Sequence, residues 1–382
     1  MKYFVFFFSF MFILSSLSSE TVNARFDPRD FVSLGNLNLS AGNIVFNTDT
    51  LQISGSFTGM GVLSQTQSNT QVAIFTFDDI ALLNGVSVSF TGSRAIALLS
   101  KNNVTIGTTL DISGAKGFEG EPANSPTPGR LGGYAGGAAQ TQTTTLLNGI
   151  GRGYLGVLTN FEAGGGGGYG GIGGTGASYF NRGASLAYGG TTYGSSSLLD
   201  LLGGSGGAGS AGLSGGNIQP SSGGAGGGAI EIAAWNQITI QSTGQIVSKG
   251  GDGGDYNTGG GGGSGGAILL TAGTSLINQG VISVVGGNGG PLDGTTVGGG
   301  GGGGGRVALY YGTGLTTGNI LTTGGYGKIS ANGGGDGANG GNGTLYSQSF
   351  YFSQASIPEP STCILFLASA AFLVLINYSM RL

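Results

Sequence analysis

Several residue types are scarce or missing in this chain of 382 residues. Histidine is absent, which excludes Ser-His-Asp and Cys-His nucleophile systems as well as histidine-based zinc sites. The only cysteine, Cys363, has no partner with which to form an intrachain disulfide. Charged residues make up only 8% of the chain, and its 13 lysines and arginines are scattered, so no nucleic acid is expected as a partner. A phosphate-binding Gly-x-x-x-x-Gly-Lys-Ser/Thr loop is also missing, and we expect no cofactor.

Glycine, in contrast, is abundant. The chain contains 87 glycines, about three times the average share of roughly 7%. Disordered chains usually combine low hydrophobicity with high net charge, whereas this chain is 38% hydrophobic and has a formal net charge of -4. The composition therefore indicates a folded protein with an unusual use of glycine, long enough for one large domain or two ordinary ones.

The N-terminal segment has the features of a secretory signal peptide. Lys2 precedes an apolar run of about a dozen residues, and a Ser-rich stretch and the small-x-small sequence Val22-Asn23-Ala24 follow. We therefore expect residues 1–24 to direct export through the Sec translocon and to be cleaved between Ala24 and Arg25. The alternative is a retained membrane anchor.

The C-terminal segment, residues 353–382, combines a proline motif with an apolar helix. Pro358-Glu359-Pro360 precedes residues 361–380, which as a helix would be roughly 30 Å long, just enough to cross a bilayer. The prolines mark the entry to this transmembrane helix, because proline is not tolerated in a helix interior. This tail resembles the PEP-CTERM sorting signal of Gram-negative bacteria, although the usual basic cluster after the helix is reduced to Arg381.

The resemblance implies a partner and a location. In that family an exosortase, a membrane-embedded cysteine transpeptidase-like enzyme, recognises the motif that corresponds here to Pro358, Glu359 and Pro360, and processes the protein. Family members are commonly exported into an extracellular polysaccharide matrix. The resemblance thus implies a protein that is transiently anchored in the membrane and then deployed at the surface or in the matrix, with polysaccharide as a further partner. An ordinary C-terminal anchor is the alternative.

A repeat of about 38 residues organises residues 228–352. Its equivalent apolar positions, which lie 38, 39 and 38 residues apart, are Ile230, Ile268, Val307 and Leu345. Each unit contains short strand-like pieces with alternating apolar residues, in the first unit 229–234, 237–241 and 244–248, and then a glycine-rich excursion. Such strands bury their apolar faces only by stacking on the next unit. The repeat therefore predicts an all-β fold, a right-handed parallel β-helix (β-solenoid) with glycine-rich excursions.

The same pattern occurs before the repeat. Residues 25–114 contain further alternating pieces, such as 94–99 and 103–106, and are predicted to form N-terminal rungs and a cap. Residues 115–227 form a glycine-rich insert, for which two structures are open. It is a disordered loop, because glycine loses the most backbone entropy on ordering, or a packed set of extended polyproline-II-like strands, as in collagen.

Two chemical functions compete with a purely structural one. Residues 250–255 fit Gly-Gly-x-Gly-x-Asp, the start of a calcium-binding nonapeptide, but only one copy is present, so we favour a glycine turn with solvated aspartates. A polysaccharide lyase or glycosidase would need a pair of carboxylates. Asp78 and Asp79 should face opposite sides of a strand, and Glu231 should point outward with no acid at the equivalent positions. We predict no catalytic residues and no metal site, and hence a non-enzymatic structural or adhesive protein rather than an enzyme or a calcium-stabilised adhesin.

Overall fold

The computed structural model divides the chain into two compact units. One is Arg25–Phe350, and the other joins Met1–Ala24 with Tyr351–Leu382. The structure describes residues 26–119, 125–139, 149–155, 162–178, 187–211, 220–290, 297–329 and 335–352. The predicted signal peptide with its cleavage site at Ala24 and Arg25, the motif Pro358-Glu359-Pro360 and the C-terminal helix lie outside these ranges. Within them, no helix is long and apolar enough to cross a membrane.

The unit Arg25–Phe350 is built almost entirely of β-strands. A single turn of 3-10 helix, Pro28–Asp30, begins after Asp27, whose side chain accepts a hydrogen bond from the Arg29 N–H. The strands are β1 (Leu37–Leu39), β2 (Gly42–Asn47), β3 (Gln52–Gly55), β4 (Gly59–Met60), β5 (Val62–Gln65), β6 (Gln71–Phe77), β7 (Ile80–Leu82), β8 (Val86–Thr91), β9 (Ala95–Ser100), β10 (Val104–Ile106), β11 (Thr109–Asp111), β12 (Ala229–Ala234), β13 (Ile238–Ile240), β14 (Gln245–Val247), β15 (Ala267–Ala272), β16 (Ser275–Asn278), β17 (Val281–Ser283), β18 (Arg306–Tyr311), β19 (Gly314–Thr316), β20 (Asn319–Leu321) and β21 (Thr344–Ser349).

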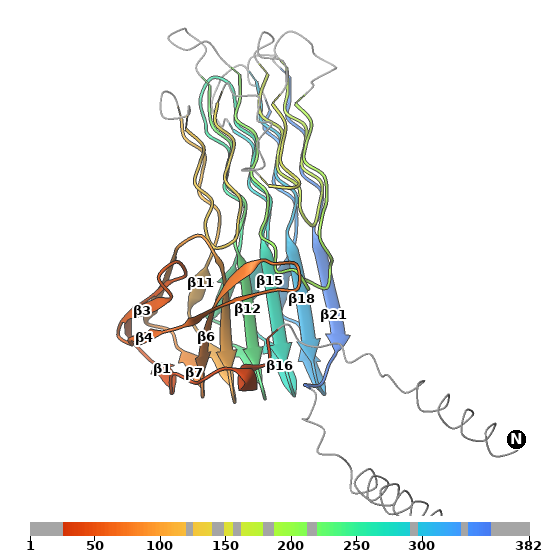
Figure 1. The fold of residues 1–382 in the computed structure, drawn as a ribbon. Helices are drawn as coiled ribbons and strands as arrows, with labels where there is room; N and C mark the ends of the chain where they lie inside the picture. Colours follow the sequence, from red (N-terminus) through yellow and green to blue (C-terminus); the bar gives the residue numbers. More distant parts are fainter. Residues whose placement is uncertain are drawn as a thin grey trace, which may run out of the picture. The chain divides into compact units, whose positions relative to one another are not determined.

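From β6 onward, successive strands belong to different sheets, and equivalent strands of successive rungs stack on one another (Figure 1). The seven-stranded sheet has the order β21-β18-β15-β12-β9-β6-β5, and the six-stranded sheet has the order β1-β7-β10-β13-β16-β19. A four-stranded sheet, β11-β14-β17-β20, completes the rungs. Apart from the β5–β6 pair, neighbouring strands in these three sheets are parallel. The fold is therefore all-β with several parallel sheets, as the repeat predicted.

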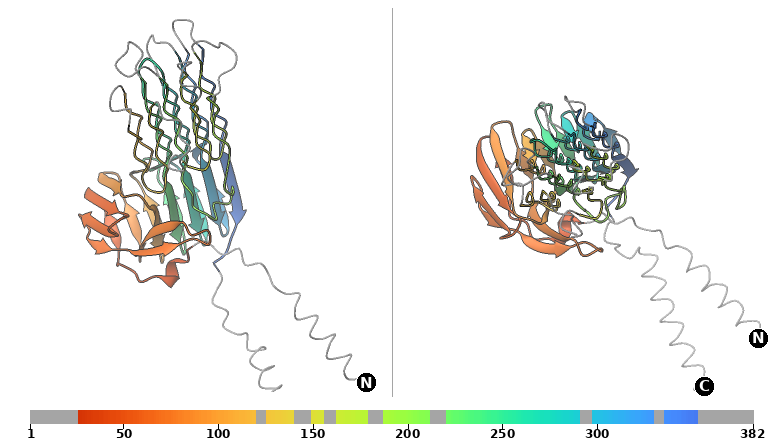
Figure 2. Two further views of the ribbon diagram at one scale, coloured as in Figure 1. Left: turned by 45° about the horizontal axis from the view of Figure 1, so that its top comes forward. Right: turned by 90° about the horizontal axis from the view of Figure 1, so that it is seen from above.

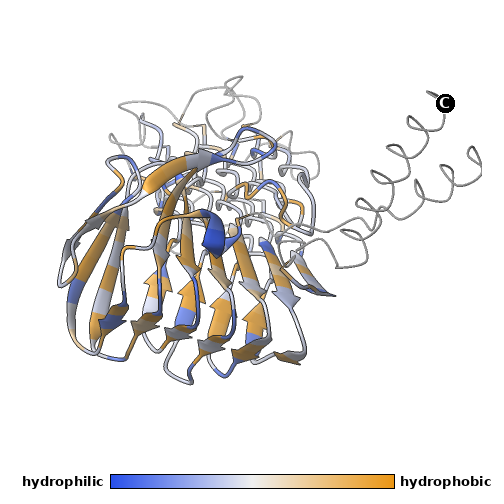
Figure 3. Ribbon diagram, turned by 60° about the horizontal axis from the view of Figure 1, so that its bottom comes forward, coloured by the Kyte–Doolittle hydropathy of each residue, from blue (hydrophilic) through white to orange (hydrophobic). Residues whose placement is uncertain are grey.

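The strand register confirms the alignment of the repeat units. Ile230 pairs with Ile268, Ile268 with Val307, and Val307 with Leu345, which are the apolar positions identified in the sequence. The alternating side chains on one face of each strand meet in a continuous core, to which β12 contributes Ile230 and Ile232. Apolar residues dominate these strands (orange in Figure 3). Burial between stacked rungs is thus what holds the repeat together.

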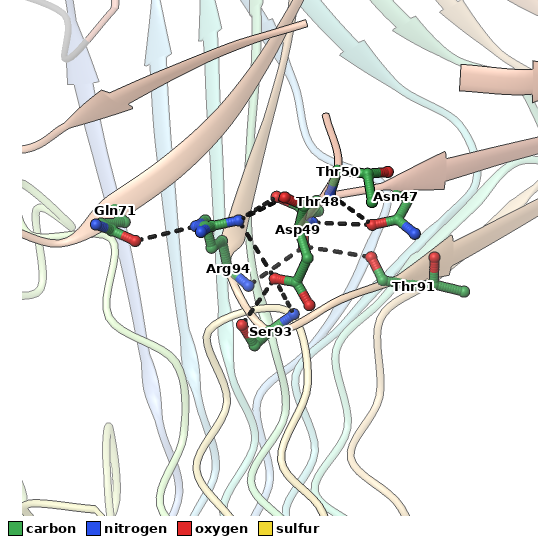
Figure 4. Close-up of polar contacts among 8 residues, drawn as sticks. All are labelled: Asn47, Thr48, Asp49, Thr50, Gln71, Thr91, Ser93 and Arg94. Carbon is green, nitrogen blue, oxygen red and sulfur yellow. Dashed lines mark hydrogen bonds and ion pairs between the residues drawn. The ribbon is translucent and has the colours of Figure 1, made fainter. Parts of the chain in front are cut away.

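The N-terminal region departs from the expected series of parallel rungs. β2 pairs in parallel with β8, but β3 pairs antiparallel with β2, and β4 pairs antiparallel with β3. A polar network fastens the β2–β3 turn to the corner before β9 (Figure 4). There the Asp49 carboxylate accepts hydrogen bonds from the Ser93 N–H (3.0 Å) and Ser93 Oγ (2.8 Å), and the Arg94 guanidinium donates to the Thr48 and Asp49 carbonyls. The hydrogen bond from the Ser93 backbone, aided by the Ser93 hydroxyl and Arg94, lowers the pKa of Asp49.

The glycine-rich excursions are extended segments that hydrogen-bond to one another in a three-residue rotation. In residues 259–266, successive N–H groups donate to three different neighbouring segments in turn. The bonds are Gly259 to Val297, Gly262 to Gly300 and Gly265 to Gly303; Gly260 to Gly254, Gly263 to Gly251 and Gly266 to Ser248; and Gly261 to Ala208 and Ser264 to Ser205. A polyproline-II helix has about three residues per turn and no internal hydrogen bonds, so each N–H faces a different neighbour. The bonding pattern is therefore that of packed polyproline-II-like strands.

Each interior segment is surrounded on all sides. Segment 259–266 also accepts hydrogen bonds from three further segments. Its six neighbours are 164–167, 205–208, 224–227, 248–254, 287–290 and 297–303. Three of them belong to the insert 115–227, so a disordered loop is the wrong alternative for the described residues of the insert, and the packed alternative is confirmed. We use the name glycine bundle for the described extended segments within 112–228, 248–266, 284–305 and 322–343. Figure 2 shows these segments end-on beside the N-terminal strands.

At many buried glycine positions, the spacing within the glycine bundle leaves no room for a side chain. A Cβ atom added to Gly261 would lie 2.0 Å from the Gly165 carbonyl oxygen, and one added to Gly302 would lie 1.9 Å from the Gly263 carbonyl oxygen. Both obstacles are backbone atoms in buried segments, which cannot rotate away. The core of the bundle thus consists of backbone and mostly small side chains, such as Ala208, Ser205 and Ser264, and is held by many hydrogen bonds between segments.

The outer face of the seven-stranded sheet is covered by the insert. The Tyr310 hydroxyl donates to the Ser197 carbonyl (2.9 Å), and the Arg306 guanidinium donates to the carbonyls of Tyr193 (2.7 Å) and Tyr169 (3.2 Å). Glu231 lies on this face of β12. Its side chain was expected to be exposed, but the residue is fully buried (0% exposed), so that expectation is wrong. Alternation along a strand assigns the face, but it does not reveal that a distant segment covers it.

Candidate functional site

One face of the glycine bundle carries side chains in regular columns. Where the chain leaves the four-stranded sheet, four equivalent segments lie side by side: Gly117 N–H donates to the Asp252 carbonyl, Gly253 to Asn288 and Gly289 to Tyr326. This register aligns Lys116, Asp252, Asn288 and Tyr326, which we call the distal column. Adjacent members are separated by one segment spacing, roughly 5 Å for chains that continue from neighbouring strands.

A second column lies three residues closer to the sheet. Gly114 N–H donates to the Lys249 carbonyl, Gly250 to Val285 and Gly286 to Thr323. This register aligns Ser113, Lys249, Val285 and Thr323, which we call the proximal column. A spacing of three residues returns a polyproline-II strand to the same face, about 9 Å further along. Glycines fill the intervening positions and face the interior, which explains sequences such as Lys-Gly-Gly-Asp-Gly-Gly.

The two columns line a hollow with a volume of about 480 Å³. All eight column residues border it, together with Leu321 at the end of β20 and glycines of the same segments. Hydrogen bonds fix the columns in place: the Asn288 N–H donates to Asp252 Oδ1 (2.6 Å) and the Tyr326 N–H donates to Asn288 Oδ1 (2.9 Å). The hollow is thus a preformed feature of the bundle surface rather than a gap between loops.

The charge of Lys116 is offset by two carboxylates, which leave the group with a net charge of -1. The Lys116 ammonium group contacts the carboxylates of Glu119 (2.8 Å) and Asp255 (3.0 Å). The hydrogen bond with Glu119, followed by the interaction with Asp255, raises the pKa of Lys116. Lys249, in the middle of the hollow, is exposed and has no ion-pair partner among the described residues. One cation in the hollow therefore remains available to a ligand.

The residues of the calcium-like motif contribute to this face in other ways. Asp252 accepts the hydrogen bond from the Asn288 N–H, and Asp255 pairs with Lys116. Across the described residues, no group of three or more His, Cys, Asp or Glu side chains is placed to hold a metal ion. Asp252 therefore belongs to the distal column, and Asp255 lies three residues further along the same segment, outside both columns.

The acids considered as catalytic candidates are dispersed, with one exception. Asp78 and Asp79 lie in the corner between β6 and β7 rather than within a strand, and Asp79 accepts a hydrogen bond from the Asn103 N–H (3.2 Å). Glu231 pairs in register with Ala97 and Leu269, so no row of acids forms at that position, as predicted. The exception is the pair formed by Glu119 and Asp255, which lie 136 residues apart in the sequence and meet at Lys116.

The exposed aromatic residue of the hollow is one that the sequence analysis missed. Tyr326 is 70% exposed at the end of the distal column, whereas Tyr169 in the insert is buried against Tyr193, with ring centroids 4.8 Å apart. Tyr188 of the insert is also exposed. The signal that would have identified Tyr326 is the recurring Gly-Gly-x-Gly, in which x is Asp252, Asn288 and Tyr326.

No family model, no curated protein and no solved structure matches this chain. Its function is therefore inferred from the residues of the molecule alone.

Proposed function

We propose that the protein is a non-enzymatic structural or adhesive component of the cell surface or extracellular matrix of a Gram-negative bacterium. It would be exported through the Sec translocon, with cleavage between Ala24 and Arg25. An exosortase would then sort it through Pro358, Glu359 and Pro360. The apolar helix that follows this motif would anchor it in the membrane until it is processed.

The observation that carries this proposal is the glycine bundle. Its segments are held together by hydrogen bonds, and many of its buried glycine positions have no room for a Cβ atom. Such a body is suited to act as a rigid spacer, because its segments are hydrogen-bonded to one another along their length, and charged residues make up only 8% of the chain. We further propose that the three strands of each rung close into a right-handed β-helix. Connections between parallel strands of one sheet are right-handed in about 98% of cases.

The carboxylate pair at Lys116 supports a structural role rather than hydrolysis. A glycosidase needs one carboxyl group that donates a proton and a second that acts as nucleophile or base. Glu119 and Asp255 instead both contact one ammonium group. The three side chains therefore tie segment 113–119 to the next segment.

Mass spectrometry of the protein recovered from its native cells and medium tests this proposal. We expect the released or surface-bound protein to begin at Arg25 and to lack the sequence beyond the Pro358–Pro360 region. A protein that ends at Leu382 and stays in the membrane fraction would show a plain anchor and would refute sorting. Deletion of Pro358–Pro360 alone should abolish the processing, whereas deletion of Ser353–Ala355, which removes the same number of residues just before the motif, serves as the matched control.

A further inference from the structure

We propose that the hollow lined by the proximal and distal columns binds a neutral glycan chain. This inference rests on the proposed surface or matrix function and names the partner that the surface contacts. It starts from three properties of the hollow: an exposed aromatic ring, a set of hydrogen-bonding groups in a fixed array, and a small net negative charge.

The aromatic ring is the phenol of Tyr326. It is 70% exposed and borders the hollow at the last segment of the distal column. A sugar ring presents C–H groups on one face, and these pack on the face of an aromatic side chain, whose π-electrons attract the slightly positive C–H hydrogens. Thr323 lies three residues away on the same segment and also borders the hollow, so a hydroxyl group accompanies the ring.

The hydrogen-bonding groups extend across four segments. Asn288 uses Oδ1 for the Tyr326 N–H, and its Nδ2 makes no hydrogen bond within the described residues. Lys249 and Thr323 add exposed donors in the proximal column. Sugar hydroxyls both donate and accept, so they suit a row that alternates amide, ammonium, carboxylate and hydroxyl groups. The row crosses neighbouring segments, and so it suits an extended chain of several sugars better than a single small molecule.

The charge of the hollow favours a neutral glycan over an acidic one. Lys116 contacts two carboxylates, those of Glu119 and Asp255, and Asp252 lies three residues from Lys249 on the same segment. Two ammonium groups and three carboxylates together give this surface a net charge of -1. The whole chain has a formal net charge of -4, which repels a polyanion at long range. The columns are also rigid, because each is fixed to the next segment by backbone hydrogen bonds, so little entropy is lost on binding.

Isothermal titration calorimetry of the detergent-purified full chain tests this inference. The probes are the polysaccharide of the native cell matrix, separated by anion exchange into neutral and acidic fractions, and neutral hexasaccharides of glucose, galactose and N-acetylglucosamine. We expect binding of the neutral fraction or of at least one hexasaccharide. Tyr326→Ala should weaken it roughly five-fold and Tyr326→Phe should preserve it, because the ring face provides the contact. Thr323→Val should weaken it by a smaller factor.

Tyr188→Ala is the matched control, since Tyr188 is exposed but does not border the hollow. No binding of any neutral probe, binding of the acidic fraction alone, or equal effects of the Tyr326 and Tyr188 variants would each overturn the inference. Binding is measured on purified protein and does not depend on C-terminal processing. A processed tail without glycan binding would therefore leave the proposed function standing and remove only this site.

Discussion

Within the fourteen consecutive residues 259–272, the chain is packed in two different ways. In β15, apolar side chains such as Ile268 and Leu270 pack between rungs. In the glycine segment just before it, backbone packs on backbone, and each N–H finds a carbonyl of a neighbouring segment. The first arrangement is driven mainly by removal of apolar surface from water. The second gains little from that effect and depends on close approach and complete hydrogen bonding.

The sheet half and the glycine half of one rung should therefore differ sharply in their tolerance of substitutions. A side-chain core adapts to small changes of volume, because neighbouring side chains shift. The glycine bundle cannot adapt in this way, since any added atom meets fixed backbone on several sides. The same change of one methyl group should therefore be mild in the sheet and severe in the bundle.

The largest effect is expected for Gly261→Ala. The new Cβ would lie 2.0 Å from the Gly165 carbonyl oxygen, so segments must separate and lose hydrogen bonds. We expect a loss of about 3 kcal/mol or more in the free energy of unfolding, at or above the upper end for overpacking. Chemical denaturation measures it. Gly314→Ala, where the nearest atom is the Ser275 Cβ at 3.4 Å, is the control and should be nearly neutral. Equal effects at both positions would argue against a tightly packed bundle.

A smaller effect is expected at the junction between the two halves. Arg306 opens β18, and its guanidinium donates to the Tyr169 and Tyr193 carbonyls of the insert. Arg306→Met keeps much of the volume but leaves both carbonyls without this donor. We expect a cost of about 2 kcal/mol, as for hydrogen bonds to charged groups. Limited proteolysis should also cut within the insert sooner in this variant. An unchanged cleavage rate would show that the insert is held without Arg306.

In the sheet core, Ile268→Val removes one methyl group from a fully buried side chain. We expect a loss of about 1 kcal/mol, the usual cost of this substitution. Equilibrium unfolding of this variant beside Gly261→Ala gives the comparison directly, since the two positions lie seven residues apart in the same rung. A cost as large as that of Gly261→Ala would show that the sheet core and the glycine bundle are equally sensitive to a change of one methyl group.

The smallest effect concerns the N-terminal cap and depends on pH. The pKa of Asp49 is lowered in the folded state, so the ionised carboxylate stabilises the fold above the unfolded pKa of about 3.9. That contribution is lost as the pH falls through the folded pKa. Because Asp49 is partly exposed, Asp49→Ala should cost no more than about 1 kcal/mol at pH 7. Thermal unfolding midpoints of the two proteins should converge toward pH 2. A constant difference across this range would exclude the charge as its cause.

The strand register was predictable from the sequence, whereas the arrangement of the glycine segments was not. Ile230, Ile268, Val307 and Leu345 reveal their alignment because apolar side chains recur at a fixed spacing. Glycine carries no such information, and its partners are distant: the Gly303 N–H donates to Gly167, in the middle of the insert. The sequence therefore left disorder and packing as equal alternatives for the insert.

The candidate hollow was hidden for a related reason. Lys249 and Tyr326 lie 77 residues apart in the sequence, and only the three-residue period of the glycine segments places both on one face. The N-terminal antiparallel pairs were also missed, because short strands such as β4 show no alternation. The burial of Glu231 could not be foreseen either, since the covering insert comes from an earlier part of the chain.

Hydrogen–deuterium exchange of the full chain tests most directly whether the glycine segments form a hydrogen-bonded core. The relevant peptides cover residues 259–266 and 299–305, with residues 267–272 of β15 as the internal reference. We predict that the glycine amides exchange about as slowly as those of β15, since each is buried and donates to a carbonyl of a neighbouring segment. Exchange of these glycines at the rate of an unprotected chain, with β15 still protected, would contradict the bundle and the rigid body proposed from it.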